Sequence, residues 1–100
     1  MAKRGQLTTK VKKEAQRLLG KEITVRELRL MPYVQSVMIN DRRIDLRKIN
    51  EEERAILSDW RERGWIGGGA AGMTISKAFW KAIHTLLLIA YVDYENQPAD

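Results

Sequence analysis

The spacing of apolar residues predicts that most of this chain is helical. In residues 8–20, apolar side chains fall at i, i+4, i+7 and i+8, which places them on one face of a helix that stops at Gly20. Residues 24–31 begin with Thr24 and Glu27 at the spacing of a capping box and continue with apolar positions on one side. The pattern therefore predicts two amphipathic helices in the first third of the chain.

Pro32 marks the expected end of the second of these helices. Proline lacks an N–H and disfavours helical backbone in the residue before it, so we expect a break or a kink here. Residues 33–39 then resume as a further helix, or they begin a hairpin over residues 34–47 that turns at Asn40 and Asp41. We favour the helix, because the turn lacks the glycine that a tight hairpin prefers.

Two further helices are predicted in the second half. Asn50 and Glu53 form another capping box, glutamates occupy the first turn, and Gly64 ends this helix. Residues 76–91 are apolar on two sides, and their polar exceptions are Lys77, Lys81, His84 and Thr85. A helix of this kind lies at the centre of a core or is partly covered by another subunit.

Together these patterns predict an all-α protein, with one domain of four or five helices over residues 8–94. Its N-terminal half has the order of elements of a helix-turn-helix protein. Residues 1–7 are expected to form a disordered basic arm and residues 95–100 a disordered tail. The alternative is a winged-helix-like fold in which residues 34–47 form the hairpin.

A glycine-rich stretch lies between the last two predicted helices. Residues 67–72, GGGAAG, match the G-x-G-x-x-G spacing of a dinucleotide-binding turn. That turn must come directly after a strand, and the preceding capped helix leaves only Trp65 and Ile66 for one. A second phosphate motif fails because Met73 stands where lysine is required. We therefore expect no nucleotide cofactor and predict a flexible hinge, with Trp65 and Ile66 folding back onto the core.

Composition removes several chemical functions. The chain has 100 residues and no cysteine, which excludes disulfides, a thiolate nucleophile and a cysteine zinc site. The single histidine, His84, has no Asp or Glu at i±3 or i±4 to orient it as a base, and a metal would need carboxylates brought together by the fold. The longest apolar run, Leu86–Val92, is shorter than the roughly 20 residues that span a bilayer. We expect a non-enzymatic cytoplasmic protein with no catalytic residue, metal, cofactor or membrane segment.

Charge is distributed unevenly. Residues 1–49 carry 13 Lys and Arg against 5 Asp and Glu, a net of +8, whereas residues 50–100 carry 5 against 8, a net of −3. A basic half suggests an anionic partner, of which nucleic acid is the commonest. On this hypothesis cations hold phosphates, and Gln35, Ser36 and Asn40 read base edges. The residues expected to contact DNA or RNA are Lys10, Lys12, Lys13, Arg17, Gln35, Arg42, Arg43 and Arg47.

A protein-interaction module, either a homodimer or a binder of another protein, is the rival hypothesis. Aromatic residues are enriched in interface cores. The expected interface residues are Trp65, Trp80, Leu87 and Tyr91. The same side chains fit equally well inside the chain's own core, and DNA, RNA and protein all remain open as partners.

One segment, from Ile49 to Val92, carries a resemblance to known proteins. The residues concerned are the glutamates before Arg54, then Trp60, Gly64, Gly67–Gly68, Phe79–Trp80 and Ala90–Tyr91. On these residues the segment, which is less than half of the chain, resembles small, functionally unassigned proteins encoded by phages and prophages. The resemblance implies a cytoplasmic accessory protein with a regulatory or host-interaction role, and it carries no activity or site residue.

Overall fold

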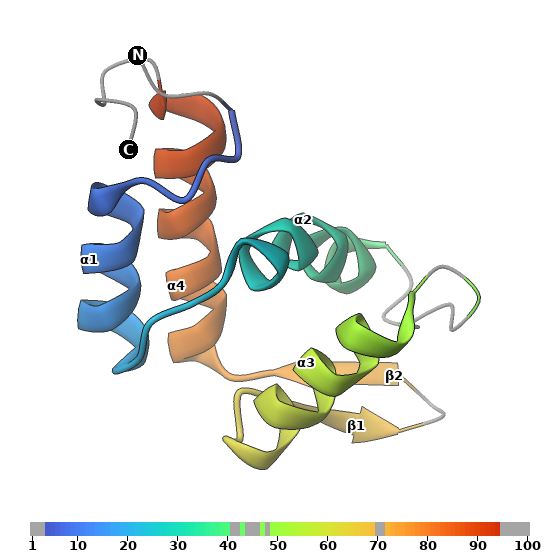
Figure 1. Cartoon of the computed structure of the whole chain (residues 1–100). Helices are drawn as coiled ribbons and strands as arrows, with labels where there is room; N and C mark the ends of the chain where they lie inside the picture. Colours follow the sequence, from blue (N-terminus) through green and yellow to red (C-terminus); the bar gives the residue numbers. More distant parts are fainter. Residues whose placement is uncertain (1–3, 41–42, 44–46, 48, 70–71, 95–100) are drawn as a thin grey trace.

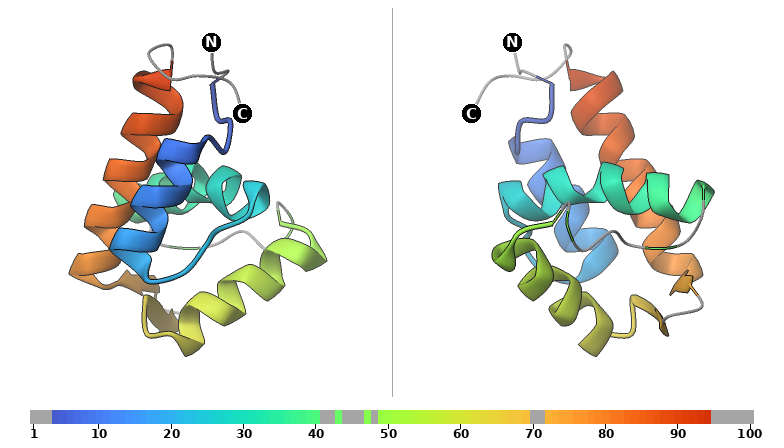
Figure 2. Two further views of the ribbon diagram at one scale, coloured as in Figure 1. Left: turned by 60° about the vertical axis from the view of Figure 1, so that its left-hand side comes forward. Right: turned by 90° about the vertical axis from the view of Figure 1, so that its right-hand side faces the viewer.

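Four α-helices, a two-stranded sheet and a closing π-helical turn make up the computed structural model, which describes residues 4–40, 43, 47, 49–69 and 72–94. The elements are α1 (Thr9–Leu19), α2 (Val25–Ile39), α3 (Glu51–Glu62), β1 (Ile66–Gly69), β2 (Gly72–Ile75), α4 (Lys77–Leu87) and η2 (Leu88–Val92). Helices α1 and α4 lie side by side as an upright pair, α2 runs away from them, and α3 and the hairpin lie beneath α2 (Figures 1 and 2). The fold is mostly helical, as predicted, but it is not all-α.

The first helix begins and ends at the predicted residues. The Thr8 hydroxyl accepts from the backbone N–H of Val11, and Gly20 adopts a left-handed φ of 72° that stops the helix. Before α1, the segment expected to be a disordered arm makes contacts from residue 5 onward, where the N–H of Gly5 donates to the carbonyl of Ala90 across 2.7 Å. Residues 1–3 and the expected tail, residues 95–100, lie outside the described residues.

The predicted break at Pro32 is wrong, because α2 runs without interruption from Val25 to Ile39. A proline inside a helix costs about 3 kcal/mol. Burial of Leu28, Met31 and Val34 offsets this, since each buried side chain of this size contributes about 1.5–3 kcal/mol. The separate helix expected after Pro32 is the second half of α2, so the predicted helix-turn-helix order is not found. The alternative hairpin over residues 34–47 is also wrong, because residues 34–39 are helical.

A buried carboxylate joins α2 to α3. Glu27 is only 5% exposed. It accepts hydrogen bonds from the N–H of Thr24 at 3.1 Å, from Lys21 Nζ at 3.0 Å and from the indole Nε1 of Trp60 at 3.1 Å. Burying a charge without partners is very costly, and here both carboxylate oxygens are hydrogen-bonded. The predicted capping box of Thr24 and Glu27 is thus also a link between helices.

The predicted limits of the third helix are confirmed. Asn50 and Glu53 exchange two hydrogen bonds of 2.9 Å between side chain and backbone, which completes the second capping box. Gly64 lies just after the helix with a φ of 77°. This left-handed residue turns the chain back beneath α3 and into the first strand.

The glycine stretch forms an antiparallel hairpin, so the predicted flexible hinge is wrong. Its register pairs Ile66 with Ile75 at the open end and Gly69 with Gly72 near the turn. Ile66 and Met73 are buried, which fixes which face of the hairpin meets the core. Arg61 of α3 also donates to the Gly68 carbonyl across 2.7 Å. Tertiary contacts therefore stabilise strands that glycine alone would disfavour.

Aromatic rings fill the core where α3, the hairpin and α4 meet. Phe79 of α4 packs edge-on against Trp60 and stacks on Trp65, with ring centroids 5.0 Å apart in both pairs. Trp65 and Ile66 fold back onto the core, as predicted from the sequence. The core thus spans both halves of the chain and leaves one side of α4 and η2 uncovered.

Candidate functional site

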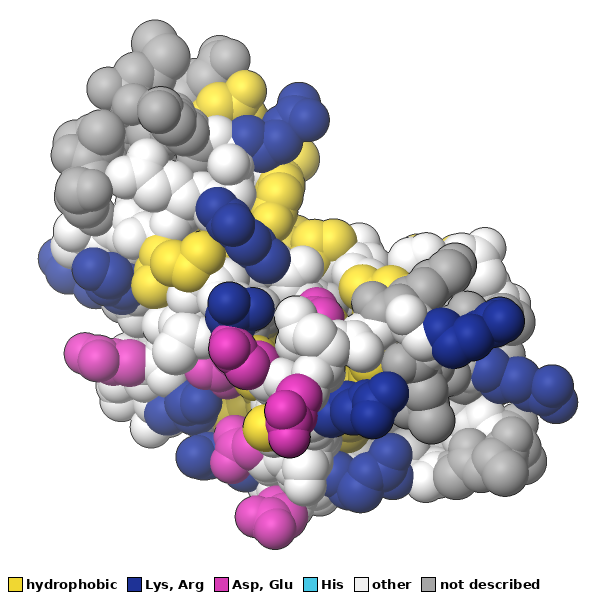
Figure 3. All heavy atoms as spheres, turned by 45° about the vertical axis from the view of Figure 1, so that its right-hand side comes forward, with side chains coloured by type: hydrophobic (Ala, Val, Ile, Leu, Met, Phe, Trp, Pro, Cys, Tyr) yellow, Lys and Arg dark blue, Asp and Glu magenta, His cyan; other side chains and the backbone are white. Residues whose placement is uncertain are grey.

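A groove lies in the angle between α2 and the C-terminal half of α4 with η2. Its volume is about 440 Å³, and it is lined by Pro32, Gln35, His84, Leu87, Leu88, Tyr91 and Val92. In Figure 3, several hydrophobic side chains reach the surface near the corner between the upright part of the molecule and the part that projects from it. We call this surface the α2–α4 groove.

Large apolar side chains remain exposed in the groove. Leu88 is 56% exposed and Val92 is 68% exposed, whereas Leu86 and Ile83 on the opposite side of α4 are fully buried. Scattered apolar residues are normal on protein surfaces, but a contiguous patch in a concave surface is typical of an interaction site. The groove is therefore concave and mostly apolar, as expected of a site that binds the apolar face of another molecule.

His84 forms part of the wall of the groove. Its Nδ1 lies 2.8 Å from the carbonyl oxygen of Trp80, and the two rings meet edge to face with centroids 4.4 Å apart. Because a carbonyl only accepts, Nδ1 is the donor in this contact. No carboxylate orients the ring among the hydrogen bonds of the described residues, so this geometry does not assemble an acid–base pair.

A second hollow adjoins the groove at Trp80. It measures about 340 Å³ and is lined by Met38, Ile75, Lys77 and Trp80. Trp80 is in ring contact with His84, which lines the groove. The two hollows therefore lie near each other along α4.

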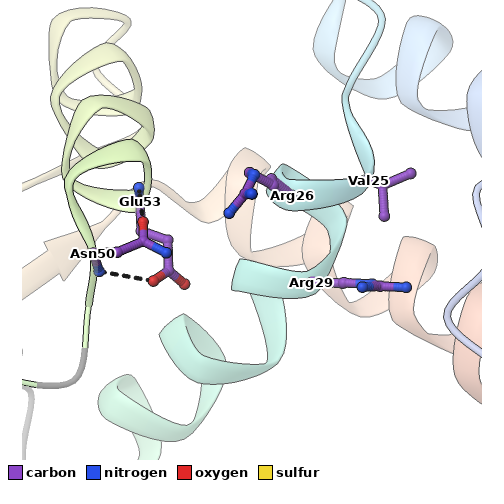
Figure 4. A pocket seen from close by; sticks show the side chains of 5 residues that line it. All are labelled: Val25, Arg26, Arg29, Asn50 and Glu53. Carbon is purple, nitrogen blue, oxygen red and sulfur yellow. Dashed lines mark hydrogen bonds between the residues drawn. The ribbon is translucent and has the colours of Figure 1, made fainter.

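A third hollow lies between the N-terminal ends of α2 and α3. Most of its polar side chains bond to other residues of the protein. Its volume is about 420 Å³, and its lining is Val25, Arg26, Arg29, Asn50 and Glu53. Figure 4 shows Arg26 between the two helices, while Asn50 and Glu53 bond to each other and Arg29 points away from α3. Arg26 pairs with the Glu52 carboxylate. Arg29 forms no ion pair with another residue that the structure describes.

The basic residues of α1 lie on its exposed side, away from the buried Val11 and Ala15. Lys10, Lys12, Lys13 and Arg17 are all exposed. Arg17 is hydrogen-bonded to Glu14, and this bond is the main reason that the pKa of Glu14 lies below its ordinary value. Lys10 lies 3.9 Å from the Asp93 carboxylate. Within the part of the chain that the structure describes, Lys12 and Lys13 form no ion pair.

The other residues expected to bind nucleic acid lie elsewhere. Gln35 lines the apolar groove. Arg43 and Arg47 are exposed and come after the end of α2 that lies farthest from α1 in Figure 1, and Arg42 is outside the described residues. The predicted set therefore does not form one surface, and the basic face of α1 stands alone.

Three of the four expected interface residues lie together. Leu87 and Tyr91 line the α2–α4 groove, and Trp80 lines the hollow beside it. Trp65 instead stacks on Phe79, with the Arg63 guanidinium 5.3 Å from its ring centroid. Leu88 and Val92 were not expected in the interface. A signal was present for Leu88, because it continues the exposed stripe of Lys77, Lys81 and His84 at helical spacing.

Metal clusters and membrane spans were the two further kinds of site that the described ranges could show. No group of three or more His, Asp or Glu side chains there could hold a metal ion, and none of the helices there is long and apolar enough to cross a membrane. Comparison with protein-family models, with curated proteins and with solved structures finds no match to this chain.

Proposed function

We propose that this chain is a non-enzymatic interaction module that binds a helix of another protein in the α2–α4 groove. The observation that carries the proposal is the exposure of Leu88 and Val92 beside Leu87 and Tyr91, in a groove of about 440 Å³. Amphipathic helices bind such grooves through apolar anchors at positions i, i+3 or i+4 and i+7. Because two helices form the walls, a third can pack between them by ordinary ridge-into-groove contacts.

The test uses peptides that form amphipathic helices with leucine anchors at this spacing. Binding is measured by the change in tryptophan fluorescence and by NMR shifts of the Leu88 and Val92 methyl groups. Leu88→Lys puts a charge in the groove and should abolish binding. Val25→Lys is the matched control, because Val25 is also an exposed aliphatic residue but lines a different hollow. Equal binding by both variants, or none by the unmodified chain, would refute the proposal.

The proposal also assigns the protein to the cytoplasm, which the absence of cysteine supports. The resemblance of residues 49–92 to small phage proteins supports a regulatory role with a host protein as the partner. A regulatory accessory protein of this kind needs no reacting groups, only a surface.

Contact with nucleic acid is the second candidate function, and the outer face of α1 favours it. Lys12 and Lys13 are exposed cations that no carboxylate among the described residues neutralises. Their contact would be with phosphates and would not depend on sequence. We expect retardation of duplex DNA, single-stranded DNA or RNA in low salt, lost in the Lys12→Glu/Lys13→Glu variant and kept in Lys77→Glu. Retardation that is absent at low salt, or unchanged in the double variant, would eliminate this candidate.

Base reading by α3 and the hairpin has weaker support. Three helices followed by a hairpin is the order of elements in a winged-helix protein. In the helix-turn-helix motif, the start of the motif's second helix contacts bases, and α3 would hold that place here. Here the first turn of α3 carries Glu51, Glu52 and Glu53, which would repel phosphates. The strands of the hairpin carry no Lys or Arg. Electrostatics therefore favours the protein-binding role over this mode of DNA recognition.

A further inference from the structure

The exposed side of α4 changes from charged to apolar along its length. Lys77, Lys81, His84 and Leu88 succeed one another at i, i+4, i+7 and i+11 and are all exposed. Neither lysine forms an ion pair within the described residues. From Lys77 to Val92 the sequence contains no Asp or Glu. Lys77 and Lys81 therefore form a short positive stripe on the exposed side of α4 that continues toward the groove, and no carboxylate of α4 neutralises it.

Two further exposed cations, Arg29 and Arg4, do not line the groove but lie next to residues that line or contact it. Arg29 lies one turn before Pro32 on α2, is exposed and has no ion-pair partner in the described part of the chain. Arg4 is exposed next to Gly5, which packs against the Tyr91 ring. Asp93, the nearest acidic residue along the chain, lies 3.9 Å from Lys10.

We propose that the helix bound in the α2–α4 groove is acidic, with Asp or Glu flanking its apolar anchors and meeting Lys77, Lys81 and Arg29. This inference rests on the proposed protein-binding function. Complementary charge guides association and selects among partners that have similar apolar faces. The same cations would repel a basic amphipathic helix, so the groove discriminates as well as binds.

The partner is a different protein and not a second copy of this chain. The acidic helix among the described elements is α3, with glutamates at positions 51–53. Its large apolar residues, Leu57 and Trp60, are buried in its own core. A second copy therefore has no described helix that offers both an acidic flank and free apolar anchors. An acidic amphipathic segment of another protein supplies both.

The experiment uses the full chain and three helical peptides with one apolar face. The flanking positions carry Glu in the first peptide, Gln in the second and Lys in the third. Dissociation constants are measured by titration calorimetry at low and at high salt. We expect the Glu peptide to bind about tenfold more tightly than the Lys peptide at low salt. The difference should shrink at high salt, because exposed charges are screened.

Charge reversal in the protein provides the matched test. In Lys77→Glu/Lys81→Glu the preference should invert, so that the Lys peptide binds more tightly than the Glu peptide. Lys12→Glu/Lys13→Glu makes the same change in net charge on α1 and should leave the preference as it is. Both pairs of lysines are exposed, so neither variant is expected to unfold the protein. Circular dichroism checks this directly.

The possible outcomes distinguish the groove function from the acidic partner. If all three peptides bind equally well, the acidic partner is refuted while the groove function stands. If none binds, both fail. Binding to anionic lipid vesicles but to no peptide would identify the surface as a lipid contact and overturn both proposals. Sedimentation as a dimer that Leu88→Lys dissociates would identify a second copy as the occupant and overturn the inference of a different, acidic protein.

Discussion

The indole Nε1 of Trp60 donates a hydrogen bond to Oε2 of Glu27 across 3.1 Å. The carboxylate belongs to the capping box at the start of α2, and the indole lies near the end of α3. One buried bond thus couples the N-terminal cap of one helix to the packing of another. The two oxygens of Glu27 therefore accept from different donors: Oε1 accepts from the N–H of Thr24, and Oε2 accepts from Trp60.

This division predicts that Glu27→Gln destabilises the protein. A glutamine has one acceptor oxygen, so it can serve Thr24 or Trp60 but not both, and its amide donor then faces another donor. We expect the free energy of unfolding to fall by about 2 kcal/mol, the range for a lost bond to a charged group. Urea denaturation monitored by circular dichroism measures the change.

Glu53→Gln is the control, since Glu53 holds the same place in the capping box of α3 and bonds only at the surface. Its loss should be about 0.5 kcal/mol or less, as for most exposed substitutions. Similar losses in the two variants would mean that the bonds from Trp60 and Lys21 together contribute nothing to stability.

Gly68→Ala is expected to disrupt the hairpin. Gly68 has a φ of 87°, and a Cβ built there would lie 2.2 Å from the carbonyl oxygen of Gly72. Gly64 has a similar φ of 77° but open space around it, so Gly64→Ala should cost only the left-handed penalty of about 1–2 kcal/mol. The Gly68 variant should lose clearly more, with the change concentrated in the amide NMR signals of β1 and β2. Equal losses would contradict the close approach of the two strands.

Stability should fall much more on truncation of Leu86 than on truncation of Leu88. Leu86 is fully buried, so Leu86→Ala leaves a cavity and should cost about 2–5 kcal/mol. Leu88 projects into the open groove, and Leu88→Ala should cost less than about 1 kcal/mol. Thermal unfolding compares the two variants. A large loss for Leu88→Ala would indicate that another surface covers this side chain in solution.

The carboxyl group of Glu14 should titrate below the ordinary range of a glutamate. The hydrogen bond from Arg17 is the main cause of its lowered pKa, and the Arg17 charge adds to it. Because the folded pKa lies below the unfolded one, this contribution to stability is present above the unfolded pKa. It is lost as pH falls through the folded pKa. NMR titration of the side-chain carboxyl should show the midpoint rising in Arg17→Gln, and an unchanged midpoint would rule out the pair.

Local signals in the sequence predicted the helix limits well. Thr24 with Glu27, and Asn50 with Glu53, satisfy backbone groups within one turn, so neighbouring residues suffice to identify them. Pro32 misled the prediction because its cost is local, whereas the burial that outweighs it depends on α4. The hairpin was missed for the same reason. Glycines give no strand signal, and the pairing depends on Ile66 and Met73 reaching the core.

The groove was predictable only in part. Leu87, Tyr91 and Trp80 could be expected from a helix that is apolar on two sides, but which of those sides is covered depends on where α2 crosses. Gln35 was expected to read base edges because the second half of α2 was treated as a separate helix. Because α2 is one continuous helix, Gln35 lies in the groove together with residues of η2. The contact between Glu27 and Trp60 joins residues far apart in the sequence, and no short pattern encodes it.

The packing of α1 against α4 has a consequence for synthesis on the ribosome. Helix α1 has 11 residues, and isolated helices shorter than about 12–15 residues are only marginally stable in water. Its buried face, Val11 and Ala15, meets α4 and η2, which follow α1 in the sequence only after α2, α3 and the hairpin. Helix α1 therefore leaves the ribosome before the surface that stabilises it. Until η2 has emerged, the face formed by Val11 and Ala15 stays unpacked.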